Sequence, residues 1–188
     1  MSKPEAPRIA LAPEGAPDWM AEAVRDGGGH LVGLAEAEGI VWADPRRPEA
    51  LVHVLDAAPQ ARWVQLPFAG IENFVHLVNN ERIWTCGKGV YADPVAELAL
   101  TLAAAGLRGL GTYSRARRWE PPQGQNLLGA RVTILGGGGI AQSLIHLLQP
   151  WDCHITVVRR TVTHLDGVDD VLEADRYADA LPGADVVV

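Results

Sequence analysis

The 188-residue chain has few cysteines, fewer basic than acidic side chains and no long hydrophobic run. Its two cysteines, Cys86 and Cys153, stand far apart, which argues against a disulfide framework and predicts free thiols in a reducing compartment. A formal charge of −7 argues against nucleic acid as a main partner, since phosphate binding needs a basic face. The longest apolar stretch, 95–107, contains Glu97 and is too short to span a bilayer.

The amino-terminal residues Met-Ser-Lys-Pro-Glu-Ala-Pro contain no apolar segment of the kind found in secretion signals. We therefore expect a cytoplasmic protein that is not attached to a membrane. Apolar residues make up 48% of the chain, and glycine and proline are plentiful without any period. This composition is typical of globular proteins with one large domain or two small ones.

Short apolar runs alternate with segments of helical spacing in the first half of the chain. This alternation predicts a parallel α/β sheet. In the helix that begins at Pro48, we expect Leu51, Val52, Val54 and Leu55 to face inward. The predicted strands are 8–12, 30–34, 39–42, 62–66 and 83–86, and the predicted helices are 17–26, one from Pro48 and one over 70–78.

A second α/β unit is predicted after a flexible link over 87–93. It would contain a long apolar helix over 95–110, a polar loop over 111–128 and a helix over 139–149, with helix-like residues at 169–180. Only three strands are expected, at 131–135, 154–158 and 184–188. A complete dinucleotide-binding fold has about six strands, so we expect this second domain to be incomplete at its carboxyl end.

A glycine loop follows the strand 131–135 and predicts a nucleotide site. Gly136 permits a tight turn, and Gly138 lets the backbone approach a pyrophosphate. Ala141 stands where a third glycine is usual and still allows close packing of helix on strand. The amides at Gly139 and Ile140 belong to a helix amino end, which favours phosphate. The alternative is a glycine-rich turn without a ligand.

Arg159 and Arg160 stand at the end of the next strand, about 20 residues past the loop. An acid at this position would bind the ribose hydroxyls of NAD, and none is present at 157–161. Two guanidinium groups suit a 2′-phosphate instead, each bond contributing about 1.5–3 kcal/mol. We therefore favour NADP(H) over NAD(H). The alternative is a pair of solvated arginines.

The segment Gln65–Glu72 indicates a second, weaker site. A strand ends here, and the amides of Phe68, Ala69 and Gly70 are predicted to lead into a helix amino end. Such a turn can hold a carboxylate without a charged side chain. The alternative is a simple connection between two elements.

With these elements in place, the chain resembles the D-isomer-specific 2-hydroxyacid dehydrogenases over nearly its whole length. The resemblance rests on the strand and Ala-Gly turn of 64–71, the crossing and helix of 87–110 with Pro94-Val95-Ala96-Glu97, the loop region 129–160 and the strand 184–187. It implies a flavodoxin-like substrate domain over 1–92, followed by a Rossmann doubly wound NAD(P)-binding domain over 93–188. It also implies a homodimer.

The resemblance further implies reversible hydride transfer between NADP(H) or NAD(H) and a small 2-oxo or 2-hydroxy acid. The enzyme would be similar to a glyoxylate/hydroxypyruvate reductase or a phosphoglycerate dehydrogenase. Family members use an arginine, an acid and a histidine in segments for which this chain has no positions, so no catalytic residue is carried over. The histidines are interpreted as structural or solvent-facing, and no metal site is expected: His30, His53, His76, His146, His154 and His164.

Two alternatives to this interpretation remain open. The first is a nucleotide-binding chain without catalytic competence. The second is a Rossmann-like methyltransferase, which the Arg159-Arg160 pair disfavours because it offers the ribose no acid partner. Two departures from the family pattern also matter: the loop reads Gly-Gly-Gly-Gly-Ile-Ala, and an arginine replaces the usual acid. The cluster Arg115, Arg117 and Arg118 is interpreted as a solvated loop face.

Overall fold

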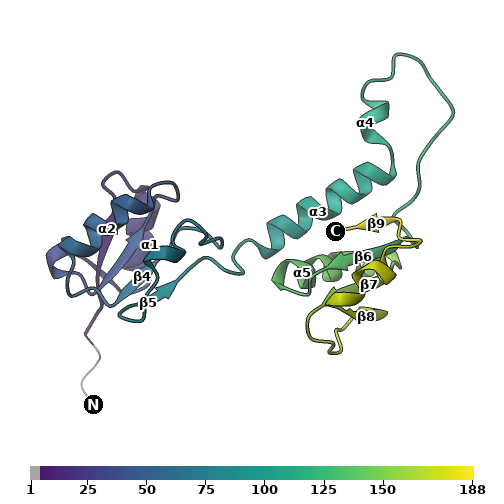
Figure 1. Ribbon diagram of the computed structural model, residues 1–188. Coiled ribbons are helices and arrows are strands. Elements are labelled where there is room, and N and C mark those ends of the chain that lie inside the picture. The colour runs from purple at the N-terminus through teal and green to yellow at the C-terminus, as the bar shows by residue number, and fades with distance from the viewer. Residues whose placement is uncertain (1–4) are drawn as a thin grey trace. The chain divides into compact units, whose positions relative to one another are not determined.

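The computed structural model describes residues 5–188 and divides the chain into two compact units. The first unit ends at Val90, and the second comprises Tyr91–Val188 (Figure 1). Each unit contains one parallel β-sheet, of five strands in the first and four in the second. The α/β architecture predicted from the sequence is therefore confirmed.

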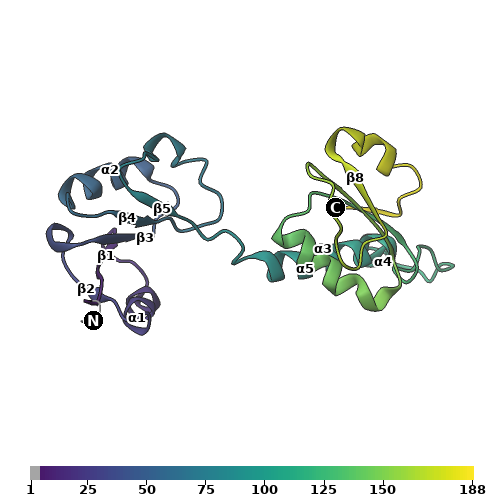
Figure 2. The ribbon, with the colours of Figure 1, turned by 90° about the horizontal axis from the view of Figure 1, so that it is seen from below.

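The sheet of the first unit has the strand order β2-β1-β3-β4-β5. Helices α1 and α2 lie on opposite faces of this sheet (Figure 2). Leu51, on α2, is fully buried with Ile40, Trp42 and Val64 in the core. The elements are β1 (Arg8–Ala12), α1 (Asp18–Asp26), β2 (His30–Leu31), β3 (Gly39–Trp42), α2 (Pro48–Ala57), β4 (Trp63–Gln65) and β5 (Ile83–Thr85).

Three details of the first unit differ from the sequence prediction. Val52 is exposed, because it lies about 100° around the helix from the buried Leu51. The strand predicted at 30–34 ends at Leu31. The helix predicted over 70–78 is only a 3₁₀ turn at Val75–Leu77. The Phe74 amide already donates to the Ile71 carbonyl three residues back, and so short a segment cannot offset the cost of nucleating an α-helix.

The sheet of the second unit has the strand order β8-β7-β6-β9. Helices α3 and α5 pack against each other on one face, and the 3₁₀ segment Ala174–Ala180 lies on the other (Figure 2). The core includes Val132, Ile134, Leu144 and Val157. The elements are α3 (Ala92–Leu107), α4 (Leu110–Tyr113), β6 (Arg131–Leu135), α5 (Gly139–Leu148), β7 (His154–Arg159), β8 (Asp170–Glu173) and β9 (Val186–Val187).

The helix predicted over 169–180 is wrong, and the second sheet has four strands instead of three. Val171 and Leu172 pair with Val157 and Val158 as strand β8, and the 3₁₀ segment follows. Because this apolar pair lies beside a buried strand, sheet pairing determines its conformation. The long helix α3 also ends earlier than predicted, at Leu107, since Gly109 adopts a left-handed conformation with φ of 64°.

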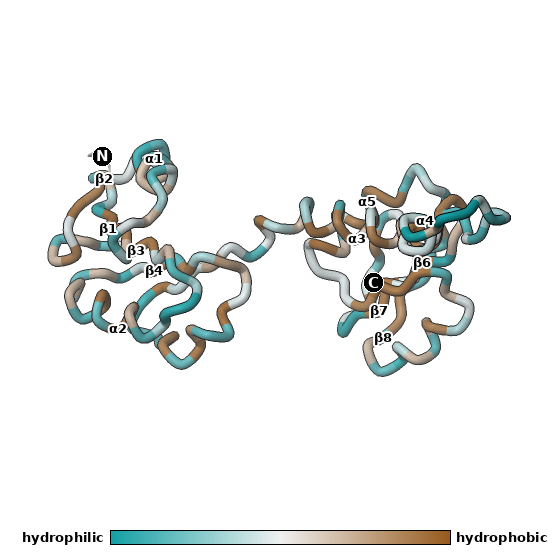
Figure 3. The backbone as a smooth tube through the Cα atoms, turned by 90° about the horizontal axis from the view of Figure 1, so that it is seen from above, coloured by the Kyte–Doolittle hydropathy of each residue, from teal (hydrophilic) through white to brown (hydrophobic). Residues whose placement is uncertain are grey.

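The loop over 114–126 is exposed and mostly hydrophilic (Figure 3). It returns to α3 through a hydrogen bond from the Gln125 amide to the Leu107 carbonyl, 2.8 Å long. The Tyr113 hydroxyl donates to the Gln123 carbonyl at 3.0 Å. The arginines of this loop, at 115, 117 and 118, are all exposed, as expected of a solvated loop face.

The remaining compositional expectations concern thiols, histidines and helices. Cys86 and Cys153 are both free, and burial raises the pKa of the Cys153 thiol. The six histidines are all exposed. Among residues 5–188, no group of side chains has the arrangement needed to hold a metal ion. Within the same residues, no helix is long and apolar enough to cross a membrane.

Candidate functional site

The glycine loop lies between β6 and α5, at the carboxyl edge of the second sheet. Gly136 has a φ of 124°, in a region that L side chains rarely adopt, so the turn requires glycine. Its amide donates to the Val158 carbonyl at 2.8 Å, which fixes the loop against β7. The apolar strand β6 therefore ends in a turn whose backbone is held in place.

The side chain of Arg159 lies beside Gly137, the second glycine of this loop. A Cβ atom added at Gly137 would stand 3.0 Å from Arg159 Cδ and 3.1 Å from its Nε. The absence of a side chain at Gly137 thus makes room for the stem of Arg159. The glycine loop and Arg159, two motifs far apart in the sequence, therefore lie side by side.

One cavity of about 530 Å³ joins the glycine loop to the end of β7. Gly136, Gly138, Arg159 and Arg160 all line it. Its only charged lining groups are the two guanidinium groups, so its electrostatic potential favours an anion. The volume is in the range of cofactor sites.

The amino end of α5 adds backbone donors to this region. Gly138 is the N-cap and makes no side-chain capping bond. The first amides of a helix have no partner within it, so those of Gly139, Ile140 and Ala141 are available to a ligand. Together with the positive end of the helix dipole, they suit a phosphate group.

Not every predicted cofactor residue lines the cavity itself. Gly139 and Ile140 lie in the first turn of α5, outside the lining, and a Cβ at Gly139 would approach Ala92 at 3.6 Å. Six further residues line the cavity and were not among the predicted cofactor residues: Leu135, Gly137, Val158, Thr161, Ala174 and Tyr177. The incorrect helix over 169–180 concealed Ala174 and Tyr177, whereas Thr161 directly follows the arginine pair and was within reach.

The turn Phe68–Gly70 lies at the carboxyl edge of the first sheet. Two backbone hydrogen bonds continue the pairing of β4 and β5 into it, from Leu66 to Thr85 at 2.8 Å and from Gly87 to Phe68 at 3.0 Å. The amides of Ala69 and Gly70 donate no hydrogen bond within residues 5–188. Ala69 and Gly70 therefore present free backbone donors at the end of a fixed strand pair.

Two observations weaken the predicted carboxylate site at this turn. No α-helix follows Gly70, so the expected helix dipole is absent there. The Glu72 carboxylate also lies close by, with Oε2 2.7 Å from the position of a Cβ at Gly70. An acid at this distance opposes a carboxylate ligand.

Both a family model and a curated relative match this chain. Residues 98–188 match the family model described as D-isomer specific 2-hydroxyacid dehydrogenase, NAD binding domain. A protein of Corynebacterium melassecola, described as an uncharacterized protein in the proB 3′ region, is 29% identical over 178 residues. That alignment covers 88% of this chain and 56% of the relative.

Solved structures of similar fold cover nearly the whole chain. A D-isomer specific 2-hydroxyacid dehydrogenase family protein of Aeromonas salmonicida matches with a TM-score of 0.78 and 19% identity, over 97% of this chain and 63% of that one. A D-isomer specific 2-hydroxyacid dehydrogenase of Xanthobacter autotrophicus, in complex with NADPH and MES, matches with a TM-score of 0.76 and 16% identity. The match covers 97% of this chain and 62% of that one. An NADPH-dependent glyoxylate/hydroxypyruvate reductase of Sinorhizobium meliloti matches with a TM-score of 0.71 and 16% identity, over 97% of this chain and 61% of that one.

The glycine loop lies within residues 98–188, the part of the second unit that matches an NAD binding domain. Over these residues the chain is similar to the D-isomer specific 2-hydroxyacid dehydrogenase family. The family resemblance drawn from the sequence is confirmed. The chain spans 56% of the length of its curated relative and 63% of that of the Aeromonas structure.

Proposed function

We propose that this protein takes part in NADP(H)-linked hydride transfer to and from a small 2-oxo or 2-hydroxy acid. The observation that carries the proposal is the single cavity in which the glycine loop meets Arg159 and Arg160. Similarity to a family of NAD(P)-dependent dehydrogenases supports the reaction class. The substrate we propose is similar to glyoxylate, hydroxypyruvate or 3-phosphoglycerate.

The residues present fit a dinucleotide. Gly136 and Gly138 would let the backbone approach the pyrophosphate, and the free amides of Gly139 and Ile140 would bind its oxygens. The nicotinamide supplies the hydride when the cofactor is bound. The contribution of this chain is to hold and orient the cofactor.

We propose NADP(H) over NAD(H) because of the charges around the cavity. Arg159 is half-buried against Gly137, and Arg160 is exposed beside it. A 2′-phosphate between these groups would accept charge-assisted hydrogen bonds. The ribose hydroxyls of NAD would find no carboxylate among the lining residues.

The strand orders support a finer assignment of the two folds. The order β2-β1-β3-β4-β5 is that of flavodoxin-like sheets. The order β8-β7-β6-β9 corresponds to 3-2-1-4 of a Rossmann sheet, with the glycine loop after its first strand. We accordingly propose residues 1–92 as the substrate domain and 93–188 as the cofactor domain. In the first, the turn Phe68–Gly70 would take the substrate carboxylate.

The proposed activity is tested by turnover. We expect the full-length protein to consume NADPH when glyoxylate or hydroxypyruvate is added, as measured by the loss of NADPH absorbance. Tight NADPH binding without any turnover of 2-oxo acids would contradict the reductase proposal. That result would favour the alternative, a nucleotide-binding chain without catalytic competence.

We also propose that the chain forms a homodimer through the second unit. Leu98 and Leu102 lie one turn apart on α3 and are 57% and 62% exposed. Trp119, in the loop after α4, is 99% exposed. An apolar groove of about 560 Å³ between α3, α4 and Trp151 lies within the same unit. Apolar surface of this extent is typical of an interface, and a second copy would cover it.

Charged substitution on α3 tests this interface. The double variant Leu98→Glu and Leu102→Glu is expected to convert the dimer to a monomer, because it would place four carboxylates in an apolar contact. Light scattering after size-exclusion chromatography measures the mass. Val52→Glu, an exposed apolar site on α2, is the control and should leave the dimer intact. A double variant that stays dimeric would rule this surface out.

A further inference from the structure

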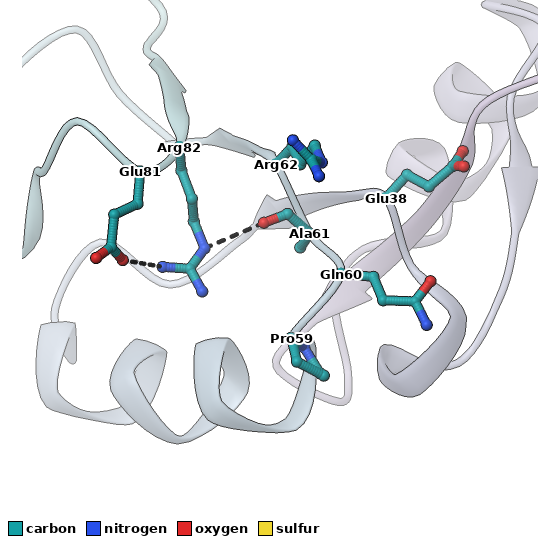
Figure 4. Close-up of a pocket in the computed structure, with 7 residues that line it drawn as sticks. All are labelled: Glu38, Pro59, Gln60, Ala61, Arg62, Glu81 and Arg82. Carbon is teal, nitrogen blue, oxygen red and sulfur yellow. Dashed lines mark hydrogen bonds and ion pairs between the residues drawn. The ribbon is translucent and has the colours of Figure 1, made fainter.

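A second cavity, of about 600 Å³, lies at the amino edge of the first sheet (Figure 4). Gly39, Trp63 and Ile83 are partners across β3, β4 and β5. The residues immediately before them, Glu38, Arg62 and Arg82, therefore form a row with strand spacings of about 4.8 Å. Figure 4 shows Arg62 between Arg82 and Glu38.

Arg82 is shielded from water but incompletely bonded. Its side chain is 18% exposed, and its Nε donates to the Ala61 carbonyl at 3.1 Å. The nearest charge is Glu81 Oε2, 3.9 Å from Nη1, beyond hydrogen-bond range, and that carboxylate is 80% exposed. A guanidinium has five N–H donors, so most of those on Arg82 have no partner among residues 5–188. A shielded charge of this kind favours an anion beside it.

Arg62 completes the cationic part of the cavity. Its side chain makes no hydrogen bond or ion pair with any residue of 5–188. Its neighbour Glu38 turns to Arg8 instead: Arg8 N donates to Oε2 at 3.2 Å, and Arg8 Nη2 lies 3.1 Å from Oε1. These hydrogen bonds hold the pKa of Glu38 below its usual value, and the bond from the Arg8 backbone has a larger effect than the bond from its side chain.

We infer that this cavity binds a small oxyanion, the phosphate or carboxylate group of a metabolite, between Arg62 and Arg82. Gln60 also lines the cavity, and its side-chain amide carries N–H donors. Arg8 offsets the charge of Glu38, and Glu81 is turned largely to solvent. The cavity volume suits a small ligand.

The location indicates an effector site. Ligands of parallel sheets bind at the carboxyl ends of the strands, where the turn Phe68–Gly70 lies in this unit. The cavity lies at the opposite edge, before β4 and β5 begin. Its occupant would not meet the proposed substrate turn, and it would act by stabilising the first unit.

Titration of the intact chain with inorganic phosphate, and separately with malonate, tests this inference. Amide NMR shifts at 60–62 and 81–83 distinguish the site from the glycine loop. We expect saturable shifts with at least one anion. Tighter binding of phosphate would identify a phosphate group as the ligand, and tighter binding of malonate would identify a carboxylate. Arg62→Gln should weaken binding about tenfold, since it removes a charge-assisted pair.

A control variant and a second cavity variant show whether the anion binds at Arg62 and Arg82. Arg25→Gln removes an exposed arginine from α1, outside the cavity lining, and should leave the affinity unchanged. Glu81→Gln should tighten binding, because it removes a competing carboxylate near Arg82. The absence of saturable shifts at 60–62 and 81–83 would overturn the inference. So would equal affinities for Arg62→Gln and Arg25→Gln.

Discussion

Replacing Gly138 by aspartate is expected to lower NADPH affinity about hundredfold or more, while the fold stays intact. The new carboxylate would accept hydrogen bonds from the free amides at the start of α5 and would repel a pyrophosphate. The loss of one or two charge-assisted hydrogen bonds corresponds to about 3 kcal/mol. No heavy atom lies within 4 Å of a Cβ placed at this position, so the substitution fits sterically.

This variant separates binding from stability because the two effects have opposite signs. Gly138 is the N-cap of α5 with a φ of −80°, which any residue adopts. Aspartate is a better N-cap than glycine, by a few tenths of a kcal/mol, so the melting temperature should hold or rise slightly. Gly138→Ala is the control and should lose far less affinity. Unchanged NADPH binding by Gly138→Asp would mean that the cofactor does not use this loop.

Replacing Arg159 by glutamine is expected to weaken NADPH binding about tenfold to hundredfold and NADH binding far less. The side chain lies against Gly137 inside the cavity, where a 2′-phosphate would accept its hydrogen bonds. A pair of this kind contributes about 1.5–3 kcal/mol. Arg159→Asp should reduce NADPH affinity further, because the carboxylate would repel the 2′-phosphate.

Calorimetric titration of each variant with both cofactors measures this selectivity. Arg118→Gln, which changes an exposed arginine of the loop after α4, is the matched control for a lost charge. It should leave the affinities for both cofactors unchanged. Equal losses for NADPH and NADH in Arg159→Gln would contradict a 2′-phosphate role for this residue.

Much of the second unit was predictable because its signals are local. The run Arg131–Leu135 contains the apolar residues Val132, Ile134 and Leu135, and the glycines directly after it allow the positive φ of a tight turn. The spacing to Arg159 then follows from the length of α5 and the strand after it. These features depend on neighbours in the sequence, and they led to the candidate cofactor residues.

The features that sequence reasoning missed depend on contacts between distant segments. Strand β8 forms because Val171 and Leu172 find β7 as a partner, whereas their sequence allows a helix as well. Tyr177 lines the cavity at the glycine loop only as a result of that pairing. The row of Glu38, Arg62 and Arg82 likewise depends on the register of three strands, which a single sequence does not reveal.

We propose that the cavity between the glycine loop and β7 selects NADP(H). The most direct measurement is a calorimetric titration of the unmodified chain with NADPH and with NADH at the same ionic strength. We expect saturable binding of both cofactors, with NADPH bound at least about tenfold more tightly, because charge-assisted hydrogen bonds form to its 2′-phosphate. Equal affinities, tighter binding of NADH or the absence of binding would contradict it.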